Sequence, residues 1–127
     1  FLTFRNAPPQ ALEEWKASLR LFLKKLMLRH GKPLILKSPP HTCRIKLLLD
    51  MFPDARFVHI HRDPFAVFQS MVHTYATGLP FGRLQRTHEV DWTERVIRQY
   101  KELYDAFFEE RGLIPDGHVP RDGLRRT

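Results

Sequence analysis

Arg62 and Ser70 are the residues whose types and spacing most strongly indicate chemistry in this chain. Arg62 follows the apolar run 57–61 and precedes Asp63-Pro64, a pair typical of a helix start. Ser70 lies about two helical turns further along. A guanidinium beside the exposed N–H groups of a helix start is suited to binding anions. The alternative is an Arg62 that pairs with Asp63 and a Ser70 that is an ordinary helix residue.

Two further candidates lie upstream, where the apolar run 34–36 ends at Lys37 and is followed by Ser38-Pro39-Pro40 and His41. A lysine fixed at this point supplies positive charge, and an imidazole titrates near neutrality and can accept a proton. The alternative interpretation is a Lys37 that ends a strand in solvent and a His41 that bonds to backbone at a helix start.

The hydrophobic pattern predicts how these residues are positioned. The apolar positions recur at helical spacing in four segments and form short continuous runs in two. The predicted helices are 10–30, 42–52, 64–75 and 91–111, and the predicted strands are 33–36 and 56–61. Strand–helix–strand order predicts an α/β fold with a parallel sheet and flanking helices. Lys37 and Arg62 would then stand at the carboxyl ends of the strands and face one crevice.

The segment Leu34-Ile35-Leu36-Lys37-Ser38-Pro39-Pro40-His41-Thr42, with Phe52-Pro53-Asp54-Ala55 and the Arg62 to Ser70 spacing, resembles the sulfotransferases. These enzymes use 3′-phosphoadenosine-5′-phosphosulfate (PAPS) as sulfuryl donor and have a fold similar to that of nucleotide kinases, which is P-loop-like. The resemblance implies that Arg62 and Ser70 bind the 3′-phosphate of PAPS. It implies that Lys37 stabilises the transition state of sulfuryl transfer to a hydroxyl or amine, with His41 as the candidate base and no metal.

The resemblance also sets the expected domain organisation, a single partial sulfotransferase domain over 1–127 with its core at 32–76 and an irregular tail at 117–127. Members of the family carry a second, glycine-containing loop that holds the 5′-phosphosulfate, and the sequence contains no such loop. The chain alone is therefore expected to be inactive.

Composition leaves two other function classes open. The formal net charge of +7 suits polyanions, so a basic helical nucleic-acid module is one alternative, with Lys24, Lys25 and Arg29 as its best case. Another nucleotide-dependent phosphotransferase is the second. Nucleic acid is the less favoured partner, because these three residues make only a small cationic cluster and a phosphate-bearing nucleotide fits the net charge equally well.

The cysteine and histidine residues limit which disulfides and metal sites the chain could form. The single cysteine excludes an internal disulfide framework and a cysteine-based zinc cluster. His59 and His61 share one face of a strand, and with His73 they form the alternative of a zinc site, which the sequence disfavours. No run approaches the roughly 20 apolar residues of a membrane span. The cytoplasm is the favoured location, and the oligomeric state and the acceptor stay open.

Overall fold

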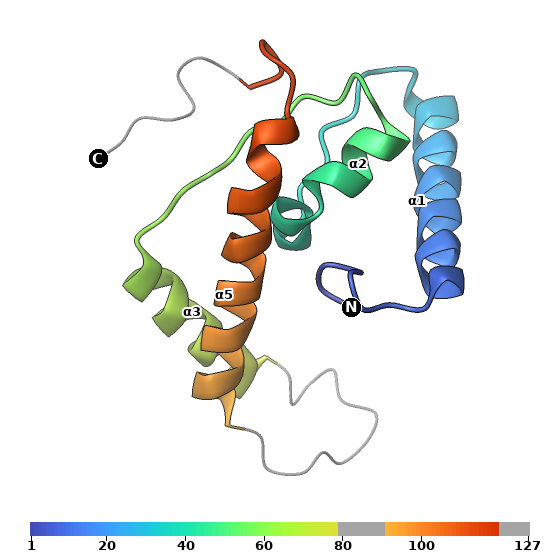
Figure 1. Cartoon of the computed structure of the whole chain (residues 1–127). Coiled ribbons are helices and arrows are strands. Elements are labelled where there is room, and N and C mark those ends of the chain that lie inside the picture. The colour runs from blue at the N-terminus through green and yellow to red at the C-terminus, as the bar shows by residue number, and fades with distance from the viewer. Residues whose placement is uncertain (79–90, 120–127) are drawn as a thin grey trace.

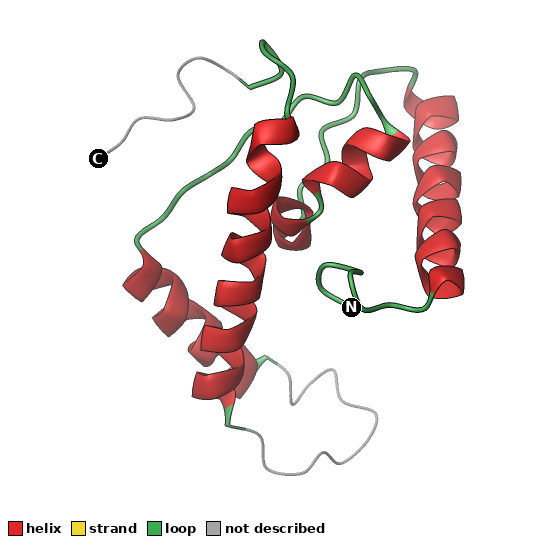
Figure 2. Ribbon diagram, in the orientation of Figure 1, coloured by secondary structure: helices red, strands yellow, loops and turns green. Residues whose placement is uncertain are grey.

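The computed structural model describes residues 1–78 and 91–119 of the chain. Its described elements are helices joined by irregular segments, as Figures 1 and 2 show. In chain order they are α1 (Pro9–His30), the short 3-10 helix η1 (Pro39–Cys43), α2 (Ile45–Met51), α3 (Pro64–Thr77), α5 (Trp92–Glu110) and the 3-10 turn η2 (Arg111–Leu113). All four predicted helical segments are confirmed, the second as η1 and α2 in succession.

Local sequence signals explain where the helices begin and end. Pro9 is the first residue of α1, and Gly31 ends the helix with φ of 59°. This left-handed conformation carries a steric penalty for residues with a Cβ, which glycine avoids. Asp91 caps α5 by accepting hydrogen bonds from the backbone N–H groups of Thr93 (2.9 Å) and Glu94 (3.2 Å). The predicted helix start at Asp91 is therefore confirmed.

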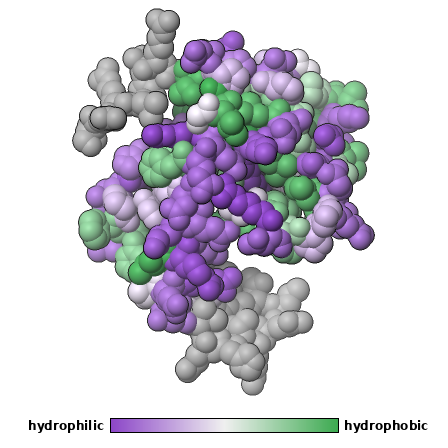
Figure 3. Space-filling model, viewed as in Figure 1, coloured by the Kyte–Doolittle hydropathy of each residue, from purple (hydrophilic) through white to green (hydrophobic). Residues whose placement is uncertain are grey.

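The core lies where η1 and α2 pack against α5, the central helix in Figure 1. Cys43, Ile45 and Val96 are almost fully buried, at 1%, 2% and 1% exposure. The other buried side chains are Leu23, Leu48, Ala106 and Phe107. Many large apolar side chains remain on the surface, and hydrophobic patches are visible between the hydrophilic ones in Figure 3. Since burial of apolar surface is the main stabilising force, this small core gives the chain little stability in reserve.

The predicted α/β fold with a parallel sheet is wrong, because the described residues form no strand (Figure 2). Segments 33–36 and 56–61 are irregular, and the side chains expected in a buried sheet are exposed: Ile35 at 97%, Val58 at 70% and Ile60 at 73%. A strand needs a neighbour for its backbone hydrogen bonds. Neither segment pairs with the other, so the apolar runs stay exposed and the predicted P-loop-like architecture is absent here.

The second of these segments instead lies along α5 with alternate residues turned inward. Phe57 and His59 are half-buried, whereas Val58 and Ile60 face solvent. The Phe57 N–H donates to the carbonyl oxygen of His118 at 2.8 Å. The two-residue alternation of an extended chain is thus present, but only one face finds a partner.

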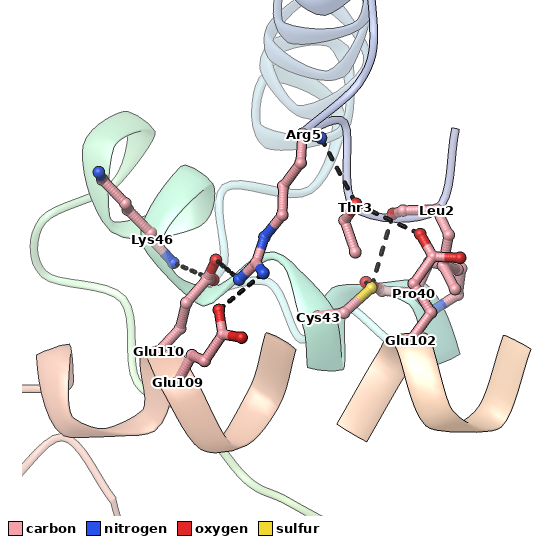
Figure 4. A network of polar contacts seen from close by, with 9 residues as sticks. All are labelled: Leu2, Thr3, Arg5, Pro40, Cys43, Lys46, Glu102, Glu109 and Glu110. Carbon is pink, nitrogen blue, oxygen red and sulfur yellow. Dashed lines mark hydrogen bonds and ion pairs between the residues drawn. The ribbon is translucent and has the colours of Figure 1, made fainter. Parts of the chain in front are cut away.

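A polar network fastens the N-terminal segment to α5 and η1 (Figure 4). The Arg5 guanidinium contacts the carboxylates of Glu109 (2.6 Å) and Glu110 (3.1 Å). Glu110 also accepts from the backbone N–H of Lys46 at 3.0 Å, which connects α5 to α2. The Cys43 thiol points to the carbonyl oxygens of Pro40 (3.1 Å) and Leu2 (3.5 Å).

Helix α3 lies at the periphery, although the apolar residues on most of its sides predict a buried helix, and that prediction is wrong. It has no buried residue, and Phe65 is 77% exposed. It is held to α5 through Tyr75, whose hydroxyl contacts the Gln99 amide oxygen at 3.0 Å and whose ring lies 5.2 Å from that of Trp92.

Within 1–78 and 91–119, none of the helices combines the length and the hydropathy that crossing a bilayer requires. The glycines and proline of segment 76–90 predict a loop there. Most of this segment, like most of the expected irregular tail at 117–127, lies outside the described residues.

Candidate functional site

The start of α3 places Arg62 beside a capped helix N-terminus. Asp63 is the N-cap, and its carboxylate accepts from the backbone N–H of Ala66 at 2.8 Å. Pro64 follows as the first helical residue. The carboxylate of Asp63 is thus engaged by the backbone, and no ion pair joins it to Arg62. Arg62 is exposed, so its guanidinium can accept an anion at the positive end of the helix dipole.

Ser70 lies on the exposed part of the same helix. Its carbonyl oxygen accepts from the Thr74 hydroxyl at 2.8 Å, and its own hydroxyl bonds no other described residue. Ser70 is six positions after Pro64, which is a rise of about 9 Å along the helix axis. Within the described part of the chain, the Arg62 guanidinium just before α3 and the Ser70 hydroxyl on its second turn are thus donors without a protein acceptor.

Lys37 and His41 lie on the segment that leads from α1 into η1. Lys37 is exposed, whereas His41 is half-buried in η1. Burial lowers the pKa of His41 below its usual value, and the nearby Arg44 charge lowers it further. The Nδ1 atom of His41 is buried and has no hydrogen-bond partner among the described residues. At neutral pH this imidazole is uncharged, which is the state that a proton acceptor needs.

Arg44 is the residue at this site that sequence reasoning missed. It donates from Nε to the carbonyl oxygen of Leu2 at 2.7 Å and from Nη2 to that of Phe1 at 3.0 Å. Its guanidinium also lies over the rings of Phe4 (4.7 Å) and Trp15 (5.0 Å). These partners are about 30 to 40 residues away in sequence, so no spacing pattern could have revealed them. Arg44 joins η1, the N-terminal segment and α1. Its positive charge also lowers the pKa of His41.

The structure does not bring the four predicted site residues together. No hydrogen bond or ion pair joins any two of Lys37, His41, Arg62 and Ser70, all of which lie in the described part of the chain. Figure 1 shows η1 and α3 on different sides of α5. The crevice expected between the ends of two neighbouring strands is absent, because those strands are not formed. The four residues thus lie on two separate segments, 37–41 and 62–70.

The histidine pair is close, as its spacing predicted, but it sits in an aromatic environment. The His59 and His61 rings are 6.4 Å apart, and His59 stacks on Phe107 at 4.4 Å. Burial lowers the pKa of His59, and His61 adds to the effect. Across 1–78 and 91–119, no three histidine, cysteine or carboxylate side chains are grouped so that they could hold a metal ion.

Comparison with known proteins supplies a second line of evidence. Residues 5–120 match the protein family described as the sulfotransferase family. The chain is 36% identical over 114 residues to omega-hydroxy-beta-dihydromenaquinone-9 sulfotransferase from Mycobacterium bovis, and equally to the protein of that name from Mycobacterium tuberculosis. The match covers 90% of this chain and 29% of each relative, so the chain spans less than a third of their length. No solved structure matches it.

Proposed function

Starting from the fact that this chain belongs to the sulfotransferase family, we propose that it carries the 3′-phosphate-binding part of a PAPS-dependent sulfotransferase. The observation that carries the proposal is the start of α3. Arg62 is exposed beside a helix N-terminus that Asp63 caps, Ser70 lies two turns later, and within the described residues neither the guanidinium nor the hydroxyl has a protein partner. A phosphate lying along these turns would be reached by both side chains.

In this proposal Lys37 and His41 serve the transfer step. The acceptor oxygen forms a bond to sulfur as the bond between sulfur and the bridging phosphate oxygen breaks, and adenosine 3′,5′-bisphosphate leaves. His41 takes the proton of the acceptor, for which its lowered pKa and neutral state suit it. The Lys37 ammonium offsets the negative charge that develops on the transferring group.

We further propose that the acceptor is a hydroxyl group. The support is the name of the mycobacterial relative, an omega-hydroxy-beta-dihydromenaquinone-9 sulfotransferase, which specifies an omega-hydroxy compound. The chain alone contains no glycine-containing loop for the 5′-phosphosulfate, so turnover by the isolated chain is not expected. Labelled PAPS with a panel of hydroxyl acceptors should therefore yield no labelled product.

Binding calorimetry with adenosine 3′,5′-bisphosphate and with AMP tests the 3′-phosphate assignment on the folded chain. A hydrogen bond to a charged group contributes about 1.5–3 kcal/mol, and the exposure of Arg62 favours the lower end. Arg62→Ala should then weaken bisphosphate binding about tenfold, with a smaller loss for Ser70→Ala. Binding of AMP should not change, because AMP lacks the 3′-phosphate.

Arg56→Ala is the matched control, since Arg56 is an exposed cation on the same segment and bonds none of the other described residues. It removes the same charge and should leave the affinity for the bisphosphate close to that of the unmodified chain. Equal weakening of both nucleotides by Arg62→Ala would show that Arg62 acts through general charge and does not recognise the 3′-phosphate.

A further inference from the structure

Helix α1 has a second face, made of both apolar and cationic side chains, that the proposed function does not use. The apolar spacing of this helix predicts an inward face of Leu12, Trp15, Leu19, Phe22, Leu23 and Leu26, and all of these except the exposed Phe22 are at least partly buried. On the opposite side, Leu21, Lys24, Lys25 and Leu28 recur at steps of three and four residues and so share one face. We call these four residues the outer face of α1.

The outer face is open to solvent and rich in apolar surface. Leu28 is 89% exposed and Leu21 is 55% exposed, and both lysines between them are exposed. Met27 and Phe22, at 58% and 55% exposure, flank it. In Figure 3 hydrophobic and hydrophilic residues alternate on the side of the molecule where α1 stands. Large exposed apolar side chains grouped in this way mark interaction surfaces.

The charge around this face has one sign. From residue 15 to residue 49 the sequence contains nine lysines and arginines and no aspartate or glutamate. Residues 1–49 carry a formal net charge of +8, whereas residues 50–127 carry −1. The net positive charge of the chain is therefore concentrated in its N-terminal part, and Arg20 and Arg29 add to the charge of α1 itself.

We propose that the outer face of α1 docks this protein on an anionic bilayer surface, with the helix axis parallel to the membrane plane. Leu21 and Leu28 would enter the boundary between headgroups and acyl chains. Lys24 and Lys25 would extend their ammonium groups to the lipid phosphates while their stems cover apolar surface. This combination of apolar and cationic side chains on one face is the signature of an interfacial helix, and it is separate from any membrane-spanning role.

Other occupants fit the outer face less well. A second copy of the chain would bring two cationic faces together, which like-charge repulsion disfavours. A nucleic acid would match the lysines but not the two leucines, which offer neither hydrogen bonds to base edges nor aromatic surface for stacking. A lipid surface is the partner that satisfies both kinds of side chain.

Sedimentation of the full chain with vesicles tests the proposal. Vesicles of phosphatidylcholine alone are compared with vesicles of phosphatidylcholine and phosphatidylglycerol in equal parts, without nucleotide, so that the outcome is independent of the proposed 3′-phosphate site. The chain should bind the anionic vesicles and be released by added salt, because salt screens surface charge. Equal binding to both vesicle types, or binding to neither, would overturn the proposal.

Three double variants assign the effect to the outer face. Each cation near an anionic bilayer is worth about a fivefold change in partitioning, so Lys24→Gln with Lys25→Gln should weaken binding roughly 25-fold. Leu21→Ser with Leu28→Ser should weaken it at least about tenfold through lost apolar contact. Arg98→Gln with Lys101→Gln removes the same charge from the exposed side of α5, and binding should stay within about twofold of the unmodified chain because that surface is not expected to touch the lipid.

Circular dichroism of each variant verifies that the helices are retained. If the lysine variant binds anionic vesicles as tightly as the unmodified chain, the outer face is not the docking surface. A duplex oligonucleotide provides the remaining arm. If it binds with an affinity that the leucine substitutions leave unchanged, and the vesicle binding is equally insensitive to them, the surface is a nucleic-acid site and the lipid proposal fails.

Discussion

Replacing Arg44 by Met removes the guanidinium that holds the N-terminal segment to η1 and α1, and it should destabilise the whole chain. Two hydrogen bonds to the carbonyl oxygens of Leu2 and Phe1 are lost, at 2.7 and 3.0 Å, together with the contacts over two aromatic rings. Methionine keeps most of the length of the side chain, so the substitution tests the charged group more than the packing.

The magnitude follows from these contacts. Hydrogen bonds to charged groups contribute about 1.5–3 kcal/mol each, and a cation–π contact adds about 0.5–1 kcal/mol. Arg44 is only half-buried, so solvent screening reduces the sum, and we expect a loss of about 2–4 kcal/mol in the free energy of unfolding. That is a large fraction of the stability of a small domain, about 5–15 kcal/mol.

Urea unfolding followed by circular dichroism measures the effect. With a denaturant slope of about 1–3 kcal/mol per molar urea, the midpoint should fall by about 1–2 M. Lys46→Met is the matched control, because this neighbouring lysine is exposed and its ammonium bonds none of the other described residues. The Arg44 variant should also raise the pKa of His41 in a nuclear magnetic resonance titration, since the Arg44 charge contributes to lowering it.

A free energy of unfolding for Arg44→Met within about 0.5 kcal/mol of that for Lys46→Met would refute the reasoning. The N-terminal segment would then be attached through contacts other than the guanidinium. Arg44→Lys offers an intermediate case, because lysine keeps the positive charge but lacks the planar fork that reaches two carbonyl oxygens at once.

Two further predictions concern carboxylates and pH. Glu110→Gln should lower the free energy of unfolding, measured with urea, by about 1 kcal/mol more than Glu109→Gln does. The reason is that Glu110 bonds both Arg5 and a backbone N–H of α2, whereas Glu109 is 60% exposed. Equal losses would contradict this assignment. Burial lowers the pKa of His41 and His59 in the folded state, so the unfolded chain binds protons more readily. Stability should be fully present above the usual histidine value of about 6.5 and fall as the pH drops below it; a urea midpoint that rises on acidification would contradict this.

The helices could be predicted because their signals are local. Pro9, Asp63 and Asp91 mark helix starts through the geometry of their own backbone and side chains, and Gly31 marks an end. The strands could not be predicted in the same way, since an apolar run becomes a strand only when another segment supplies hydrogen bonds. Val58 and Ile60 have strand-like composition and alternation, yet no partner segment covers them.

In the candidate site, too, the features set by neighbouring residues could be predicted, and those set by distant segments could not. The exposed Arg62 beside a capped helix follows from residues within one turn of it. The prediction of a crevice between Lys37 and Arg62 depended on two strands lying side by side. It was wrong because the two segments do not form strands. The contacts of Arg44 could not be predicted from residue spacing, because its partners belong to segments that come close only when the chain folds.

Because Cys43 is buried, the reactivity of its thiol depends on how often the protein opens around it. The thiol is 1% exposed, burial raises its pKa, and it is the single cysteine of the sequence. Thiolate is the reactive form, so an alkylating reagent should modify Cys43 mainly when its surroundings open, and the N-terminal segment is one of these through Leu2. The rate of labelling would then measure how often this segment detaches, without any probe attached to the protein. Because global and local opening respond differently to urea, the same thiol can tell fraying of the N-terminus from unfolding of the core.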